Sequence, residues 1–270
     1  MPLLPDFLII GVQKGGTTSL YRYLLQHPQV APAATKEVHF FDLHYGQGLD
    51  WYRAQFPELG SRRGDRPVLT GEASPYYVFH PLAAQRIQEV MPTAKLIVLL
   101  RNPVDRALSH YFHEVRWGFE TLDLEAALAC EGDRLAGEAE RMLDDGSYQS
   151  FNYQHYSYLK RGRYGEQLKG WRSRFSASQI LVLCSEQFYE NPAATLDRVT
   201  AFLGLEPFEF GPFEAHNAGD YAPPEPGQRA QLQAYFQPHN EQLWRYLRQE
   251  WPHLERDEFL SGRCWDAIAP

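Results

Sequence analysis

The sequence predicts an α/β fold in which a central parallel sheet is flanked by helices. Continuous apolar runs at residues 7–10, 95–100 and 179–184 are typical of strands that are buried on both faces. Segments with helical character lie between these runs, and strands that alternate with helices are typical of a parallel sheet. We therefore expect a single three-layer domain over residues 1–270.

Along the first half of the chain, glycine and proline mark the boundaries of the expected elements. These are a strand at 7–10, a helix near 17–26, an aromatic-rich stretch at 36–56, a charged loop at 60–67, a short strand near 68–70, a helix near 80–90 and a strand at 95–100. Asn102 and Pro103 then predict a helix start, because asparagine is a favoured N-cap and proline is favoured at the first helical position.

The second half contains one acidic, glycine-containing segment at 118–147, which we expect to be a surface insertion with helical parts. The remaining expected elements are helices near 148–160 and 164–174, a strand at 179–184, a helix at 192–203, an irregular proline-rich loop at 206–227 and a last helix over 227–248. Pro192 predicts the start of its helix for the same reason as Pro103.

Charge and composition exclude several classes of partner. The formal net charge is -8 and the pI is about 5.7, which argues against a nucleic-acid partner and against a strongly polyanionic acceptor. The widely spaced Cys130, Cys184 and Cys264 show no metal-binding spacing, so we expect reduced thiols and no metal. No segment approaches about 18 consecutive apolar residues and no signal peptide is evident, which predicts a cytoplasmic protein without a membrane span.

The residues that follow the first strand indicate a phosphate-binding loop. Gly11, Gly15 and Gly16 allow backbone N–H groups to approach an anion, and the helix that begins at Thr17 favours negative charge at its N-terminus. The spacing from Gly11 to Gly16 is that of a P-loop, but Thr17 stands where the P-loop lysine belongs and the lysine is Lys14 instead. The expected ligand is a phosphorylated nucleotide, bound differently from ATP in an ordinary ATPase. The alternative is an ordinary glycine-rich turn.

Two residues after the strand at 95–100 are candidates for a second phosphate site. Arg101 follows this strand directly, and Ser109 lies about two helical turns further on. Arginine binds phosphate through a forked, charge-assisted hydrogen bond, and serine binds it through its hydroxyl group. A structural ion pair of Arg101 explains the same spacing equally well, so both interpretations remain open at this point.

The segment at 36–42 contains groups suited to acid–base chemistry. If the segment is extended, Glu37 and His39 lie on the same side. A carboxylate beside an imidazole can take a proton from an attacking hydroxyl group. The alternatives are a surface acid and a packed histidine. Glu72 is a weaker candidate of the same kind.

Several of these segments directly follow expected strands. They are residues 11–18, 71–74, Arg101 and 185–186. Ligands of parallel sheets bind beyond the carboxyl ends of the strands, so we expect these segments to converge on one site.

Three motifs, taken in order, resemble the PAPS-dependent sulfotransferases, in particular the branch of the heparan sulfate 3-O-sulfotransferases and the N-deacetylase/N-sulfotransferases. The motifs are residues 11–20 (GVQKGGTTSL), 36–42 (KEVHFFD) and 100–109 (LRNPVDRALS). Further matches follow at 179–183, Glu186, 191–192 and 202–205. The resemblance spans residues 6–250 and is to a soluble, bacterial type of this family.

The resemblance implies transfer of the sulfuryl group of PAPS to a hydroxyl group or an amine, with release of PAP. The donor-binding residues that it implies are Lys14, Gly15, Gly16, Thr17, Thr18 and Ser19 for the 5′-phosphosulfate, and Arg101 and Ser109 for the 3′-phosphate. Lys14 would also neutralise the bridging oxygen as PAP leaves. This scheme needs no metal, because the lysine and the loop amides carry the charge.

The same resemblance assigns roles on the acceptor side. Glu37 matches the catalytic base and His39 matches its helper. Glu72, Tyr76 and Tyr77 are also expected to face the acceptor. An in-line transfer needs a base on the acceptor and a cation on the leaving group, and its loose transition state depends mostly on positioning.

Two departures from the heparan-type pattern remove positive charge. Ala73 replaces a lysine that follows the glutamate at position 72, and Asn217 to Gly219 replace a late Lys-Gly-Arg motif. Both changes argue against a sulfated polysaccharide. The expected acceptor is a small hydroxylated metabolite, a lipid, a glycan or a carrier-bound intermediate.

Two other functions fit parts of the pattern. A P-loop kinase that uses ATP needs a lysine next to Thr17 and a magnesium-binding aspartate after a strand, whereas the strand at 95–100 ends in Arg101. A non-catalytic nucleotide-binding scaffold would fit if Glu37 were buried in a structural pair.

Overall fold

The computed structural model describes residues 4–57, 68–213, 225–252 and 254. The chain divides into two compact units, each built from two stretches of sequence. Unit 1 takes residues 1–100 and 171–216, and unit 2 takes residues 101–170 and 217–270. The prediction of a single domain stays a prediction.

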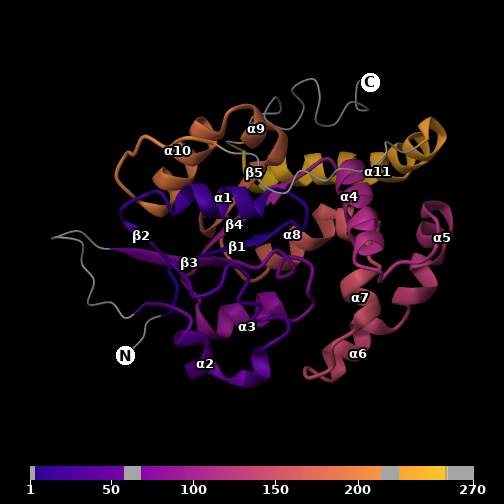
Figure 1. Cartoon of the computed structure of the whole chain (residues 1–270), viewed down its shortest axis with the longest axis horizontal. Coiled ribbons are helices and arrows are strands. Elements are labelled where there is room, and N and C mark those ends of the chain that lie inside the picture. Colours follow the sequence, from indigo (N-terminus) through magenta and orange to yellow (C-terminus); the bar gives the residue numbers. More distant parts are fainter. Residues whose placement is uncertain (1–3, 58–67, 214–224, 253, 255–270) are drawn as a thin grey trace. The chain divides into compact units, whose positions relative to one another are not determined.

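Unit 1 contains the sheet. Its elements are β1 (Phe7–Gly11), α1 (Thr17–Leu24), β2 (Val30–Pro32), the 3-10 helix η1 (Tyr45–Gln47), α2 (Leu49–Arg53), β3 (Leu69–Ala73), α3 (Ala83–Val90), β4 (Lys95–Leu100), the 3-10 helix η3 (Ala177–Gln179), β5 (Ile180–Cys184), α9 (Ser185–Glu190) and α10 (Pro192–Leu203). Within the described residues the strands form one parallel sheet in the order β2-β3-β1-β4-β5 (Figure 1). The predicted α/β class and its helix-flanked parallel sheet are therefore confirmed.

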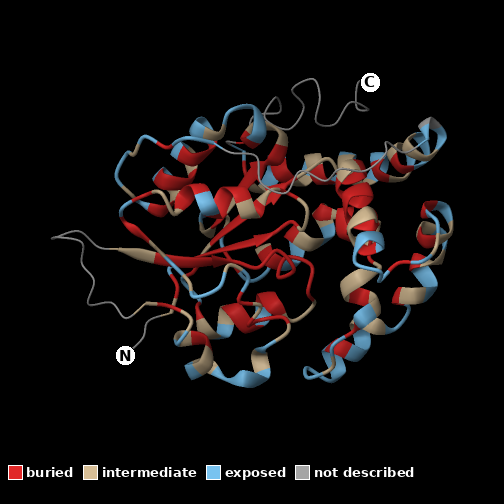
Figure 2. Ribbon diagram, in the orientation of Figure 1, coloured by how far each residue is buried: buried red, intermediate tan, exposed pale blue. Residues whose placement is uncertain are grey.

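The sheet is covered on both faces, as the apolar runs predicted. Every residue of β1 is buried, and β4 is buried from its second residue onward (Figure 2). On one face Leu20 of α1 and Val199 of α10 pack with Ile9 and Ile97 of the sheet, and α3 lies on the opposite face (Figure 1). Burial of such aliphatic side chains contributes roughly 1.5–3 kcal/mol each.

The register brings the carboxyl ends of the strands to one edge. Ile9 of β1 is paired with Ala73 of β3, and Gly11 is paired with Val98 of β4. At the far end of the pairing, Leu100 of β4 is level with Cys184 of β5. The loops after β1 and β3 therefore start side by side.

Unit 2 is helical. Its elements are α4 (Pro103–Arg116), α5 (Leu124–Leu135), α6 (Glu138–Asp144), α7 (Phe151–His155), the 3-10 helix η2 (Lys160–Gly162) and α11 (Pro226–Glu250), while α8 (Tyr164–Arg172) crosses the boundary between the units. The Asn102 side chain accepts hydrogen bonds from the Val104 and Asp105 amides, so the predicted cap and the start at Pro103 are confirmed. Segment 118–147 has the expected helical parts, and Ala127 of α5 is buried in the core of this unit.

One predicted helix, at 148–160, is wrong. Only α7 forms there, capped by Ser150. The amides of Leu159 and Lys160 donate instead to the carboxylate of Glu131, at 2.6 and 2.7 Å, so they have no helical partner. The short β2, α2 and α9 were not predicted.

Some predictions fall on residues that the structure does not describe. The loop at 60–67, Cys264 and the Asn217 to Gly219 replacement lie outside the described residues. In the part of the chain that is described, no helix combines the length and the apolar character needed to cross a bilayer.

Candidate functional site

The loop between β1 and α1 is folded tightly against the sheet. The Val12 amide donates to the Leu99 carbonyl of β4 at 3.1 Å, and the Gly15 amide donates to the Val12 carbonyl at 2.9 Å. A Cβ atom at Gly15 would lie 2.6 Å from the Leu99 carbonyl oxygen, so glycine alone fits there. Lys14 and Gly16 both have left-handed backbones, with φ of 70° and 93°.

The end of this loop, at residues 15–18, is the predicted anion-binding cradle. Gly16 is the N-cap of α1 and has no side chain with which to cap the first-turn amides. A Cβ atom at Gly16 would lie 2.6 Å from the Tyr189 hydroxyl oxygen, so the two groups are closely packed. Ser185 Oγ donates to the Gly15 carbonyl at 2.6 Å and ties the start of α9 to the loop. Thr17 and Ser19 are buried, and Lys14 and Thr18 are half-buried. A helix N-terminus built in this way fits a phosphate or sulfate group.

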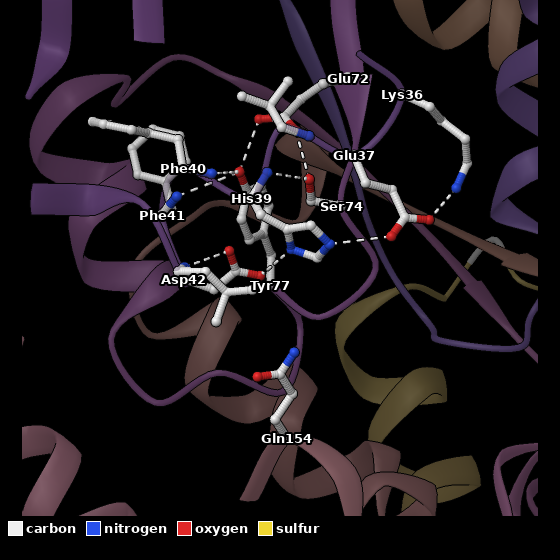
Figure 3. Close-up of polar contacts among 12 residues, drawn as sticks. Lys36, Glu37, His39, Phe40, Phe41, Asp42, Glu72, Ser74, Tyr77 and Gln154 are labelled. Carbon is white, nitrogen blue, oxygen red and sulfur yellow. Dashed lines mark hydrogen bonds and ion pairs between the residues drawn. The ribbon is translucent and has the colours of Figure 1, made fainter. Parts of the chain in front are cut away.

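A chain of charged groups occupies residues 36–42 (Figure 3). His39 donates from Nδ1 to Asp42 Oδ2 at 2.8 Å and from Nε2 to Glu37 Oε2 at 3.1 Å. Lys36 Nζ donates to the other oxygen of Glu37. His39 also has a left-handed backbone, with φ of 52°. The sequence-predicted pair of Glu37 and His39 is therefore brought together.

The neighbours of His39 fix the charges in this chain. Burial would lower the pKa of His39, but hydrogen bonds to Asp42 and Glu37 outweigh it and raise the pKa to about 10. Burial would raise the pKa of Glu37, but the hydrogen bond from His39 and the charge of Lys36 outweigh it and lower the pKa to about 2. At neutral pH an imidazolium therefore lies between two carboxylates.

The three other residues expected on the acceptor side are buried. Glu72 and Tyr77 are fully buried and hydrogen-bonded to each other at 2.9 Å. Tyr76 is also buried and packs its ring edge-on against His80. Their direct contact with an acceptor stays a prediction, which the burial of Glu72 and Tyr77 disfavours.

Arg101 and Ser109 belong to unit 2. Arg101 precedes the N-cap of α4, and its carbonyl oxygen accepts a hydrogen bond from Tyr164 at 2.8 Å. Ser109 lies in α4 and is buried. Their assignment to a 3′-phosphate stays a prediction.

Asp42 received no role from the sequence, whereas Ser74 and Ser185 were expected only as parts of segments that converge on one site. Its position three residues after His39 could have indicated Asp42, because a turn of the chain brings a carboxylate at that spacing next to the imidazole ring. Ser74 and Ser185 both directly follow strands, as residues of a site at the edge of a parallel sheet do. Among the described residues, no group of three or more histidine, cysteine and carboxylate side chains is placed to hold a metal.

Comparison with protein families gives one match over most of the chain. The model of the family described as "Sulfotransferase domain" matches residues 4–214. A crystal structure of a sulfotransferase from Alicyclobacillus acidocaldarius is 33% identical, with a TM-score of 0.72, and the match covers 91% of this chain and 96% of that chain.

Curated relatives that are named as sulfotransferases match this chain over only part of their own length. Heparan sulfate glucosamine 3-O-sulfotransferase 3B1 of Mus musculus is 36% identical, and the match covers 75% of this chain and 47% of that protein. Membrane-associated sulfotransferase kil1 of Dictyostelium discoideum is 28% identical, and the match covers 92% of this chain and 66% of that protein. The bifunctional heparan sulfate N-deacetylase/N-sulfotransferase 1 of Caenorhabditis briggsae is 33% identical, and the match covers 79% of this chain and 24% of that protein.

Proposed function

This chain belongs to the sulfotransferase family, and on that premise we propose that it transfers the sulfuryl group of PAPS to a hydroxyl group or an amine and releases PAP. The observation that carries the proposal is the hydrogen-bonded chain Glu37–His39–Asp42. The Ala73 amide at the end of β3 donates to the Lys36 carbonyl, and Ser74 accepts a hydrogen bond from the His39 amide, so this chain lies at the carboxyl end of the strand that pairs with β1.

In this mechanism Glu37 takes the proton of the attacking group. Its side chain is 38% exposed, so a bound acceptor has access to it, which argues against the scaffold with a buried structural pair. His39 is already protonated at neutral pH, so it orients and stabilises the Glu37 carboxylate rather than acting as the base. The side chain of Asp42 is fully buried and accepts the hydrogen bond from Nδ1, on the side of the ring away from Glu37.

Lys14 and the cradle serve the leaving group. The acceptor oxygen or nitrogen forms the new bond to sulfur while the bond between sulfur and the bridging oxygen of PAPS breaks. Negative charge then grows on that oxygen, and a lysine and backbone amides placed beforehand stabilise it without reorganisation. The 3′-phosphate would be bound by Arg101 and Ser109, an assignment that rests on the match of residues 100–109 to the family motif.

The acceptor class is the finer part of the proposal. Two of the relatives are named for heparan sulfate, so a glycan hydroxyl or amine is a reasonable first acceptor to test. The net charge of -8 and Ala73 favour an acceptor with less negative charge than heparan sulfate. A cytoplasmic location and independence from metal remain predictions, and one relative is named as membrane-associated.

The test combines binding with turnover. Calorimetry should show PAP binding far more tightly than ATP, and Arg101→Ala should weaken PAP binding by about 1.5–3 kcal/mol, as for a charged hydrogen bond to phosphate. PAP release from PAPS is then measured across a panel of neutral alcohols, phenols, carrier-bound hydroxyls, and uncharged and sulfated glycans. ATP binding as tight as PAP would favour the kinase alternative. Tight PAP binding without transfer to any acceptor would favour the scaffold.

A further inference from the structure

The carboxylate of Glu72 collects backbone N–H groups from the segment that carries His39. The Val38 amide donates to Glu72 Oε2 directly, at 3.2 Å. The His39 amide donates to Ser74 Oγ at 3.0 Å, and Ser74 Oγ donates to the same Oε2 at 2.6 Å. One oxygen of a fully buried carboxylate thus holds two successive amides, one of them through a hydroxyl relay.

The other oxygen repeats this arrangement for the next two residues (Figure 3). The amides of Phe40 and Phe41 donate to the Tyr77 hydroxyl at 2.8 and 3.3 Å. Tyr77 in turn donates to Glu72 Oε1 at 2.9 Å, and Tyr52 donates to the same oxygen at 2.8 Å. The amides of the four consecutive residues 38–41 are therefore all linked to the Glu72 carboxylate by hydrogen bonds. The Val38 amide binds it directly, and the other three bind it through a hydroxyl group.

Both oxygens of Glu72 act as acceptors, and this determines the direction of these bonds. A carboxylate only accepts hydrogen bonds, so the hydroxyl hydrogens of Ser74 and Tyr77 must point at it. Their lone pairs are then left to face the amides of residues 39–41. A side chain at position 72 with a hydrogen-bond donor in place of either carboxylate oxygen would compete for the lone pairs of the Ser74 and Tyr77 hydroxyls. Buried amides of residues 39–41 would then be left without an acceptor.

We propose that Glu72 is a positioning residue of the transfer reaction, which holds residues 38–41 in place and so fixes Glu37 and His39 against each other. The inference deepens the proposed function and rests on it. Two observations favour it over a merely structural role. The backbone of His39 is left-handed, and such a conformation persists only where the surroundings enforce it. Burial also raises the pKa of Glu72, because removing a carboxylate from water costs free energy that hydrogen bonds offset only in part.

A matched pair of tyrosine variants tests the proposal. Tyr52 and Tyr77 are both fully buried and both donate to Glu72 Oε1, but only Tyr77 accepts from the segment at 38–41. Tyr77→Phe should lower kcat about 100-fold, the effect of a misplacement near 1 Å, while Tyr52→Phe keeps kcat within about threefold. PAP affinity should stay unchanged in both, measured well below each melting temperature. Equal kcat in the two variants would overturn the proposal.

A second readout needs no acceptor. The imidazole of His39 is titrated by NMR in the wild type, Tyr52→Phe, Tyr77→Phe and Glu72→Gln. The charged groups around the ring are Glu37 and Asp42, with Lys36 on Glu37 and Arg86 near Asp42. Loosening the segment should bring the His39 pKa down by about one unit or more in Tyr77→Phe and Glu72→Gln, and not in Tyr52→Phe.

These two measurements separate the possible failures. If the wild type forms no PAP with any acceptor, the proposed function fails, and the His39 titration still shows whether Glu72 positions the segment. An identical His39 titration in all four proteins would refute the positioning role whatever the activity. If Glu72→Gln does not fold, the tyrosine pair carries the test alone.

Discussion

The loop after β1 and the segment at 36–42 are held in place by different means. In the first, the restraint is steric, because Gly15 lies against the Leu99 carbonyl without room for a Cβ atom. In the second, the restraint is polar, because successive backbone amides are hydrogen-bonded to Glu72, either directly or through the hydroxyl groups of Ser74 and Tyr77. Steric restraint is indifferent to pH, whereas a polar network depends on the protonation of its members.

The two regions share one feature in spite of this difference. Each has a non-glycine residue with positive φ, Lys14 in the loop and His39 in the segment. Such a backbone costs of order 1–3 kcal/mol and is found where the surrounding structure enforces it, often at functional sites. Both residues have proposed roles in the reaction. The comparison therefore indicates that Lys14 and His39 are both fixed through their backbones.

The largest expected effect is a loss of kcat caused by a substitution in the segment at 36–42. Glu37→Gln keeps the shape of the side chain but removes the proton acceptor, and loss of a general base lowers kcat by about 10²–10⁴-fold. PAP affinity should remain nearly unchanged, which calorimetry checks. The comparison with His39→Ala identifies the base. If Glu37→Gln turns over normally and His39→Ala does not, the base is His39.

The corresponding change on the steric side is Lys14→Ala. It should lower kcat more than it raises KM, because charge on the leaving group grows only in the transition state, and loss of one such donor costs about 10²–10³-fold in kcat. Steady-state kinetics with PAPS measure the two constants. Lys169→Ala, on the exposed side of α8, is the matched lysine control and should change neither. A rise in KM alone would make Lys14 a binding residue.

A glycine variant tests the steric restraint itself. Gly15→Ala places a Cβ atom 2.6 Å from a backbone oxygen that has little freedom to move. Overpacking of this kind destabilises by about 1–3 kcal/mol, and PAP affinity should fall with it. The control is Gly132→Ala in α5, where nothing lies within 4 Å of the new atom, and which should be stabilising by about 0.5–1 kcal/mol. Chemical unfolding measures both, and an unchanged midpoint for Gly15→Ala would show that the loop yields.

The last prediction is the dependence of stability on pH, which should distinguish the two regions. The pKa of His39 is raised from 6.5 to about 10, so its contribution to stability is complete below 6.5 and is lost as the pH rises through 10. The loss of unfolding free energy in His39→Gln should therefore shrink between about pH 6 and about pH 10. The loss in Gly15→Ala should stay constant over the same range. A constant loss in His39→Gln would mean that the ring is not held as an imidazolium.

The sheet and the loop between β1 and α1 were predictable because the sequence patterns that indicate them involve residues close together in the chain. The run from Lys95 to Leu100 and the start at Pro103 depend on residue types in sequence, and both were placed correctly. The helix expected at 148–160 was wrong because Glu131, far along the chain, takes the amides of Leu159 and Lys160. Tertiary hydrogen bonds of this kind leave no periodic pattern in the sequence.

The site shows the same division. Glu37 and His39 were found as neighbours in sequence, and their contact was confirmed. The part that was missed joins residues 34 and 35 positions apart, in the bonds from Val38 to Glu72 and from His39 to Ser74. Glu72 itself was expected to face the acceptor, because the sequence around it does not indicate whether the carboxylate points outward or into the core.

The bond between Ser185 and Gly15 has a consequence for how the protein is made. It joins residues 170 positions apart, and β1 is the first strand of the chain although it lies in the middle of the sheet. A ribosome that adds ~5–20 residues per second takes roughly 10–30 s to reach Ser185 after Gly15 has been synthesised. During that time the loop after β1 lacks its hydrogen bond to Ser185, although β3 and β4, the sheet neighbours of β1, have already been made. The loop that is proposed to hold PAPS is therefore completed only after most of the chain has left the ribosome.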